Sequence, residues 1–271
     1  MITRIGYARR GNPARRGWQT GPVLAFALSG LGISCEAELG VETEAAPAAL
    51  VESAAEEAGS VYREGPRTAD GIGKYYLGRE IADYIRGHGA IVWLERRSRE
   101  REEEPDKLVE ALDLAPGAVV ADIGAGSGYI SFRIAERTPE GRVYAVDIQE
   151  EMLEFLEKRI EETGLSQVVP VLGTIEDTKL PEGEVDAAIL VDAYHEFSHP
   201  YEIMTSVVRA LKKGGRVYLV EYRANDPDVP IKPLHTMTPE QAKKEMEAVG
   251  LRWKETLTIL PWQYVFVFEK P

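Results

Sequence analysis

The sequence predicts an α/β fold: a seven-stranded, mostly parallel sheet with helices on both faces and a helical extension at its N-terminal side. Short apolar runs alternate with amphipathic segments between residues 118 and 249, a pattern typical of strands joined through helices. Two apolar runs divided by Pro261-Trp262 follow, which predicts a terminal hairpin with an antiparallel last strand. Three glycines come directly after the first strand, where the backbone can approach a ligand without a Cβ in the way.

The expected elements follow these runs in order. Strands are expected at residues 119–123, 143–148, 168–172, 185–191, 217–222, 252–260 and 263–268. Helices are expected at residues 129–137, 150–162, 201–211 and 239–249. Strands connected through helices pair in parallel by right-handed crossovers.

The residues before the first of these strands are expected to form a linker and a lid. Residues 36–60 hold seven Glu and eight Ala without a basic residue, and such a segment buries too little apolar surface to order itself. We therefore predict an acidic linker at residues 36–72. Residues 73–112 are expected to form a helical lid on the domain of residues 73–271, with helices at 75–85, 91–104 and 106–112. The mixed charges of residues 96–104 indicate a solvated helix face.

Residues 1–35 have the layout of a secretory signal. Residues 1–21 contain five Arg and no acid, residues 22–34 are mostly apolar, and Cys35 follows the small residue Ser34. The string Leu31-Gly32-Ile33-Ser34-Cys35 resembles a bacterial lipoprotein lipobox, although Gly32 stands where that pattern usually has Leu. This resemblance implies an exported protein anchored to a membrane of the cell envelope by a lipid on Cys35. The alternative is a cytoplasmic protein with an apolar N-terminal helix and an incidental Cys.

Charge and cysteine content exclude several classes of protein. The formal net charge of −13 disfavours a nucleic-acid partner, because such proteins carry dense basic patches. A single Cys excludes an internal disulfide and a zinc site built mainly on thiolates.

The glycine loop has the composition of a nucleotide-binding turn. Gly124, Gly126 and Gly128 lie between an expected strand and an expected helix, whose first free N–H groups suit a carboxylate or a phosphate. Asp147 ends the next strand, where a carboxylate can accept hydrogen bonds from two ribose hydroxyls. Asp122, just before the loop, would repel a pyrophosphate but can attract an amino group. The D-x-G-x-G-x-G spacing also differs from the G-x-G-x-x-G of dinucleotide folds.

Together these residues resemble motif I of the class I S-adenosylmethionine-dependent methyltransferases, and the likeness extends over about residues 106–271. It implies a Rossmann-like sheet, in which the glycines wrap the methionine part of the cofactor, Asp122 faces its ammonium and Asp147 holds its ribose. Residues 173–177 occupy the family's adenine-contact loop, with Thr174 where Asp is frequent. The cofactor-binding residues implied are Asp122, Gly124, Ala125, Gly126, Ser127, Gly128, Asp147, Ile148, Thr174 and Ile175. A dinucleotide-binding domain, or a fold that has lost its ligand, is the alternative.

A second motif, His195-Glu196-Phe197-Ser198-His199, matches the H-E-x-x-H pattern of zinc proteases. That chemistry needs both His on one face of a helix. Here the motif directly follows a buried strand, and Pro200 suits the first turn of a helix that starts there. We therefore expect the two imidazoles not to share a helical face, which argues against a metalloprotease.

The same stretch is a candidate substrate site. Ligands of open α/β sheets bind outside the carboxyl ends of the strands, and methyltransferases of the family carry substrate-facing residues after this strand. Asp192, Tyr194 and His195 are the candidate catalytic residues, with His195 as a base or as a structural residue. No metal is assigned from the sequence. The alternative is a Mg²⁺ ion on Asp192 with Glu221 or Asn225-Asp226.

The sequence therefore predicts methyl transfer from S-adenosylmethionine to an oxygen, nitrogen or carbon atom of a small molecule. One alternative is a membrane-tethered protein of the same fold that binds a ligand without turnover. The other is the zinc protease.

Overall fold

The computed structural model describes residues 61–84 and 88–271. The expected signal with Cys35, and the expected linker up to residue 60, lie outside the described residues. Within the described ranges, every helix is too short or too polar to cross a membrane.

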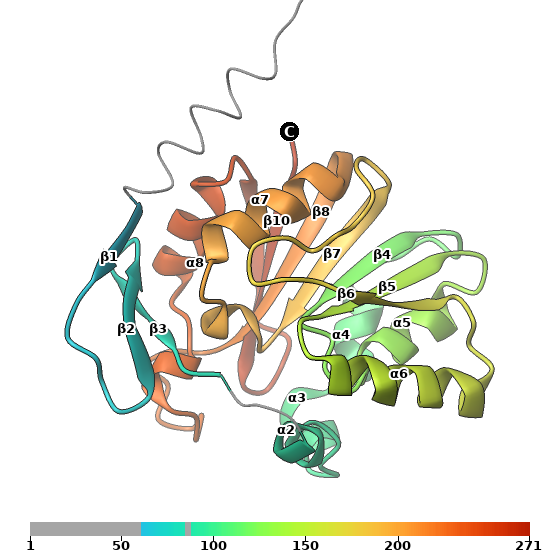
Figure 1. Cartoon of the computed structure of the whole chain (residues 1–271), viewed down its shortest axis with the longest axis horizontal. Coiled ribbons are helices and arrows are strands. Elements are labelled where there is room, and N and C mark those ends of the chain that lie inside the picture. The colour runs from blue at the N-terminus through green and yellow to red at the C-terminus, as the bar shows by residue number, and fades with distance from the viewer. Residues whose placement is uncertain (1–60, 85–87) are drawn as a thin grey trace, which may run out of the picture. The chain divides into compact units, whose positions relative to one another are not determined.

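The centre of the fold is the predicted seven-stranded sheet (Figure 1). Its strands lie in the order β6 (Val168–Leu172), β5 (Arg142–Asp147), β4 (Val119–Ile123), β7 (Val185–Val191), β8 (Leu211–Tyr222), β10 (Gln263–Glu269) and β9 (Arg252–Leu257). β4 to β8 pair in parallel, whereas β10 is antiparallel to both β8 and β9. The predicted α/β class, the seven-stranded, mostly parallel sheet and the antiparallel last strand are confirmed.

Helices cover both faces of this sheet because its strands are apolar on both sides. Val265 and Val267 of β10 pack into one core cluster, and Phe266 and Phe268 pack into the other, as the alternation of side chains along a strand requires. The first cluster receives side chains from α4 (Pro105–Ala111), α5 (Ser131–Arg137) and α6 (Glu150–Thr163). The second receives side chains from α7 (Pro200–Ala210) and α8 (Pro239–Glu247).

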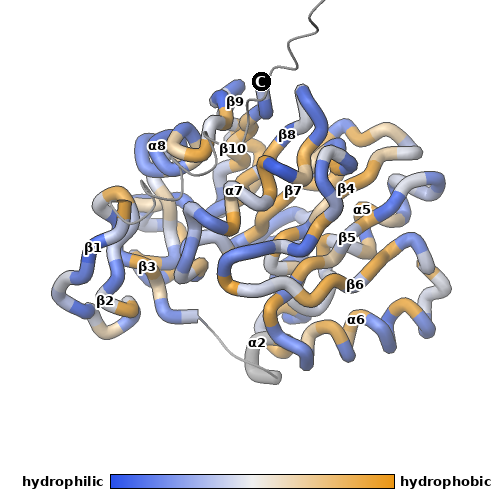
Figure 2. Tube along the Cα trace, turned by 45° about the horizontal axis from the view of Figure 1, so that its top comes forward, coloured by the Kyte–Doolittle hydropathy of each residue, from blue (hydrophilic) through white to orange (hydrophobic). Residues whose placement is uncertain are grey.

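The covering helices are amphipathic, as their sequences predict. Along α6 hydrophobic and hydrophilic residues alternate at helical spacing (Figure 2), and Met152 and Leu156 are its buried residues. The main domain also contains two 3₁₀ turns, η1 (Tyr194–Glu196) after β7 and η2 (Pro233–His235) after β8.

The N-terminal side of the fold corrects one prediction. Residues 75–85 were expected to form a helix, but the chain forms a three-stranded antiparallel sheet of β1 (Tyr62–Glu64), β2 (Gly71–Tyr76) and β3 (Arg79–Ala82). Leu77 and Gly78 both have positive φ values, 46° and 100°, and form the two-residue turn of a hairpin. Tyr76 and Ile81 are both fully buried. Packing of these two side chains against the rest of the protein therefore favours the hairpin over the helix that the spacing of apolar residues predicted. β1 and the start of β2 also lie within the stretch expected as linker.

The rest of the extension is helical, as predicted. α2 (His88–Leu94) and α3 (Arg99–Glu103) replace the single helix expected at residues 91–104, and α4 follows from Pro105. The expectation of a solvated face at residues 96–104 is wrong for two residues, since Arg99 and Glu103 are each only 3% exposed.

Candidate active site

A cavity of about 610 Å³ lies at the carboxyl ends of four neighbouring strands. Ile123, Asp147, Val191 and Tyr222, which end β4, β5, β7 and β8, all line it. This is where open α/β sheets bind their ligands. Of the site residues predicted from the sequence, those lining this cavity are Gly124, Gly126, Asp147, Ile148, Thr174, Ile175, Asp192 and His195.

The glycine loop is shaped by backbone conformations and contacts that exclude side chains. Gly124 and Gly126 have positive φ values of 76° and 54°. A Cβ on Gly124 would lie 2.8 Å from the Cβ of Ala193, and one on Gly126 would lie 2.6 Å from Cδ1 of Leu94. Positive φ values and these contacts therefore favour glycine at both positions, and the loop's backbone forms part of the cavity wall.

Asp147 connects this loop to the end of β5. Its Oδ2 accepts a hydrogen bond of 2.9 Å from the Gly126 N–H, and its Oδ1 accepts one of 3.0 Å from the Gln149 N–H. Burial raises the pKa of this carboxyl group. Each carboxylate oxygen keeps a further lone pair. This lone pair can accept a hydrogen bond from a hydroxyl group of a ligand in the cavity.

Five predicted site residues do not line the cavity: Asp122, Ala125, Ser127, Gly128 and Tyr194. Asp122 is buried and accepts a 2.6 Å hydrogen bond from the Ser131 hydroxyl on α5, and burial raises its pKa to about 6. The Ser127 hydroxyl donates to Glu95 at 2.5 Å. Tyr194 is fully buried beneath the guanidinium of Arg79, and burial raises the pKa of its phenol.

The H-E-x-x-H motif does not form a helical zinc-binding pair. His195 and Glu196 belong to η1, while His199 precedes α7, which begins at Pro200. His199 lies near Glu176, with 3.9 Å between Nε2 and Oε1. The prediction that the two imidazoles would not share a helical face is confirmed.

His195 is instead held by buried groups on two other elements. Its Nδ1 lies 2.6 Å from Oε2 of Glu221 on β8, and its backbone N–H donates to Oε1 of the same carboxylate at 3.3 Å. The Arg79 guanidinium donates to the His195 carbonyl at 3.1 Å. Burial lowers the pKa of His195 to about 3 and raises that of Glu221 to about 8, so the imidazole is uncharged near neutral pH. Its Nε2 lies 3.1 Å from Nδ1 of His235.

The Mg²⁺ ligands considered from the sequence have other partners. Glu221 faces His195, and Asp226 pairs with Arg223 at 2.9 Å. Asp192 accepts a 3.0 Å hydrogen bond from Gln263 at its Oδ2, whereas its Oδ1 is buried without a hydrogen-bond partner among the described residues. Burial and the nearby Glu103 carboxylate raise the pKa of Asp192 well above its ordinary value.

Charged residues of the N-terminal helices complete the cavity wall, and sequence reasoning missed most of them. The Glu103 carboxylate accepts from Arg96 at 2.7 Å, from Arg99 at 2.5 Å and from the Tyr222 hydroxyl at 2.8 Å. All four residues line the cavity. The i, i+4 spacing of Arg99 and Glu103 was visible in the sequence, but such pairs normally face solvent.

Comparisons with known proteins agree with this geometry. A family model described as "Methyltransferase domain" matches residues 114–268. An uncharacterised methyltransferase of Mycobacterium tuberculosis is 39% identical over 119 residues, which are 43% of this chain and 46% of that protein. A protein-L-isoaspartate O-methyltransferase of Pyrococcus horikoshii is 31% identical over 112 residues, 41% of this chain and 48% of that protein. The chain thus matches about half the length of these relatives.

Among solved structures, a SAM-dependent methyltransferase from Aquifex aeolicus superposes with a TM-score of 0.65 at 21% sequence identity. It covers 69% of this chain and all of its own, and at this identity the likeness concerns the fold. Because the family model spans more than half of the sequence, the chain belongs to the methyltransferase domain family.

Proposed function

We propose that this member of the methyltransferase domain family transfers a methyl group from S-adenosylmethionine to an oxygen, nitrogen or carbon nucleophile of a small molecule, bound beside Asp192 and His195. The single observation that carries the proposal is that one cavity contains the glycine loop, Asp147 and the His195 region. Methyl transfer from a sulfonium is an in-line displacement, which requires donor and nucleophile to be held together in one enclosure.

The polar groups that follow β7 suit an uncharged or weakly polar acceptor. Asp192 presents a buried Oδ1 that lacks a partner in the described part of the chain, and such a group is stabilised by a ligand's hydrogen bond. His195 contributes an uncharged imidazole at the same end of the cavity. These groups orient the acceptor, and the apolar residues Val191 and Phe197 contact its body.

The acceptor class can be tested with S-adenosylmethionine that carries a tritiated methyl group. The protein is incubated with a bacterial extract separated into dialysable small molecules, protein and nucleic acid. We expect tritium in the small-molecule fraction. Tritium only in protein or nucleic acid would contradict the proposal.

A matched pair of variants locates the acceptor end of the cavity. Asp192→Asn is expected to lower transfer while S-adenosylmethionine still binds. Asp186→Asn is the control, because Asp186 lies at the opposite end of the same strand and accepts the Val119 N–H there at 2.9 Å. Equal activities of the two variants would contradict a role for Asp192.

We also infer that the protein is exported and anchored through Cys35. The inference rests on the basic stretch, the apolar run and the small residue before Cys35 in residues 1–35, and its test is described in the Discussion.

A further inference from the structure

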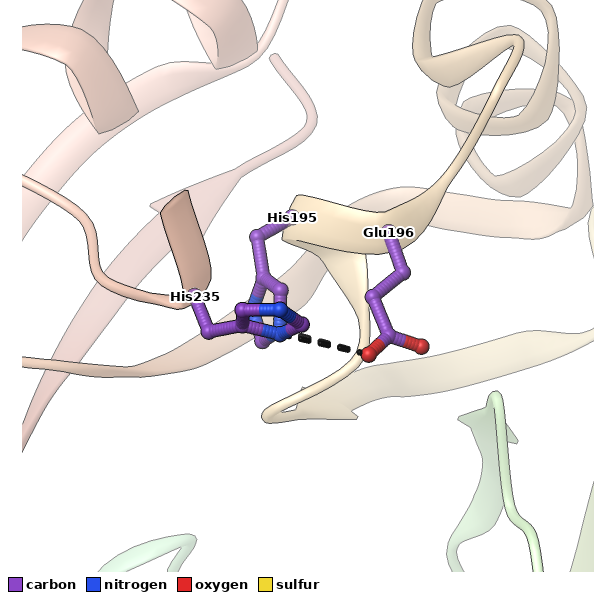
Figure 3. A group of neighbouring side chains, drawn as sticks. All are labelled: His195, Glu196 and His235. Carbon is purple, nitrogen blue, oxygen red and sulfur yellow. Dashed lines mark hydrogen bonds and ion pairs between the residues drawn. The ribbon is translucent and has the colours of Figure 1, made fainter. Parts of the chain in front are cut away.

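We propose that His195, Glu196 and His235 form a binding site for a divalent first-row transition metal, of which Zn²⁺ is the reference ion, at the acceptor end of the cavity. Among the described residues this is the one group of three or more His, Cys, Asp or Glu side chains whose ligand atoms all lie within 4.8 Å of one another. In Figure 3 the imidazole rings of His195 and His235 lie close together, and a dashed line marks the contact between His235 and the Glu196 carboxylate.

The separations of the three ligand atoms match the size of a coordinated metal ion. Nε2 of His195 lies 3.1 Å from Nδ1 of His235 and 3.8 Å from Oε1 of Glu196, and the latter two atoms are 3.3 Å apart. A circle through three points at these distances has a radius of about 2.0 Å, which equals typical Zn–N and Zn–O bond lengths. One ion can therefore contact all three atoms without movement of the backbone.

The surroundings of His195 have the form that metal-binding histidines usually have. Such a residue directs its second ring nitrogen to a carboxylate, which fixes the ring and makes the free nitrogen a better ligand. Here Nδ1 of His195 lies 2.6 Å from the fully buried Glu221 carboxylate, so Nε2 is the nitrogen that faces the cluster. The Arg79 guanidinium fixes the backbone of the same residue through its carbonyl.

The third ligand comes from a distant part of the chain that the fold holds in place. His235 ends η2, and Met237, two residues further on, donates its N–H to the Tyr222 carbonyl at 2.9 Å. A parallel bridge between Arg223 and Met237 fixes the same connection. The segment after β8 thus folds back over the strand that carries Glu221, and His235 faces His195.

Two histidines and one carboxylate leave coordination positions for an outside ligand. All three residues line the cavity that contains Asp147 and the glycine loop. The metal site itself stands independently of methyl transfer. Its role, to bind a hydroxyl or carbonyl oxygen of the acceptor beside the cofactor, rests on the proposed function.

The first experiment measures Zn²⁺ binding to chelator-treated protein by calorimetry, in the absence of S-adenosylmethionine. We expect one ion per chain for the wild type. For His235→Gln we expect affinity to fall by more than about 100-fold, since loss of a group that merely orients a ligand already costs about 10- to 100-fold. His199→Gln is the matched control, because His199 belongs to the H-E-x-x-H motif but not to the cluster, and it should bind Zn²⁺ as the wild type does.

A second measurement separates the direct ligands from Glu221. Co²⁺ in place of Zn²⁺ reports coordination through its visible spectrum. Glu221→Gln should keep the one-to-one stoichiometry and weaken affinity by about 10- to 100-fold, as expected for a residue that positions a ligand. Acetohydroxamate, a bidentate oxygen ligand, should change the spectrum of the wild-type Co²⁺ protein if coordination positions are open.

Two results would overturn the metal site: a wild type that binds neither ion, or equal loss of affinity in His199→Gln and His235→Gln. A Co²⁺ spectrum that acetohydroxamate leaves unchanged would overturn the role of the ion in binding the acceptor. Circular dichroism establishes that the variants are folded. Calorimetry with S-adenosylmethionine on the same samples separates the two ideas, because His235→Gln should still bind the cofactor. A wild type that does not bind S-adenosylmethionine would count against the proposed function and not against the metal site.

Discussion

At the residue scale, Asp147 has two kinds of contact: it fixes the glycine loop, and it lines the cavity at the carboxyl ends of the strands. Each of its carboxylate oxygens accepts one backbone N–H and retains one lone pair for a ligand.

We expect Asp147→Ala to weaken S-adenosylmethionine binding by about 1–3 kcal/mol, the usual effect of losing hydrogen bonds to a charged group. Isothermal titration calorimetry measures the change. Glu154→Ala is the control, since Glu154 is exposed on the next helix, α6, and lies outside the cavity. Unchanged affinity of the Asp147 variant would show that the ribose assignment is wrong.

Asp122 gives a prediction about pH. Burial raises its pKa from 3.8 to about 6, so the folded protein holds this proton more tightly than the unfolded chain does. Asp122 therefore contributes stability that is fully present below about pH 4 and is lost as the pH rises through 6. Two pKa units correspond to about 3 kcal/mol.

The Asp122→Asn variant keeps a side-chain oxygen that can accept from Ser131 but does not titrate. We expect the wild type to lose stability relative to this variant between pH 4 and pH 7, by at most about 3 kcal/mol. Urea unfolding at several pH values measures this difference. Parallel stability curves for the two proteins would contradict the raised pKa.

Which site residues the sequence could predict depends on how local their contacts are. The glycine loop and Asp147 lie within one strand–helix–strand unit, so their spacing alone indicated a cofactor site. His235 and Glu221 meet His195 from 40 and 26 positions away. His235 reaches His195 only because the chain after β8 folds back over that strand. No repeating pattern of residues in the sequence indicates that this segment folds back.

At the scale of elements, the N-terminal sheet is joined to the main domain through a buried ion pair. Arg79 on β3 donates to both carboxylate oxygens of Glu245 on α8, at 2.7 and 2.9 Å. The two side chains are 9% and 0% exposed. Removing one partner of such a pair leaves a buried charge without compensation.

We expect Arg79→Met to lower the free energy of unfolding by about 3–5 kcal/mol. The double variant Arg79→Met/Glu245→Leu should regain part of this loss, because neither charge then remains buried. Arg67→Met is the matched control, since Arg67 pairs with Asp83 at an exposed position, where such pairs contribute about 1 kcal/mol or less. Urea denaturation compares the four proteins, and similar losses for Arg79→Met and Arg67→Met would refute this account.

The same hairpin shows where prediction of elements fails. The main strands were recognisable because they are buried on both faces and read as continuous apolar runs. β2 and β3 instead contain Lys74, Arg79 and Glu80, and their turn is Leu77-Gly78, without the Asn-Gly or Asp-Gly that signals a hairpin. Their sequence is compatible with a helix, and contacts with distant residues decide the outcome.

At the scale of the whole molecule, the main prediction concerns where in the cell the protein is found. If residues 1–35 are an export signal with an acylated Cys35, the wild type should fractionate with membranes, and Cys35→Ser should release it into the soluble fraction. Ser34→Thr is the control, because it changes the neighbouring residue but keeps Cys35, and it should fractionate with membranes as the wild type does. Soluble wild-type protein would disprove the anchor.

The N-terminal helices have a consequence for turnover. Glu95 pairs with Arg159 at 2.9 Å, and Glu100 pairs with Arg133. Leu94 and Arg96 of the same segment line the cavity in which the cofactor is proposed to bind. These side chains are only partly buried, and dissolved ions screen such contacts. We propose that the spent cofactor leaves past this segment, so that these contacts oppose its release. We therefore expect the rate of product release, and with it the speed of each catalytic cycle, to rise with the ionic strength around the protein.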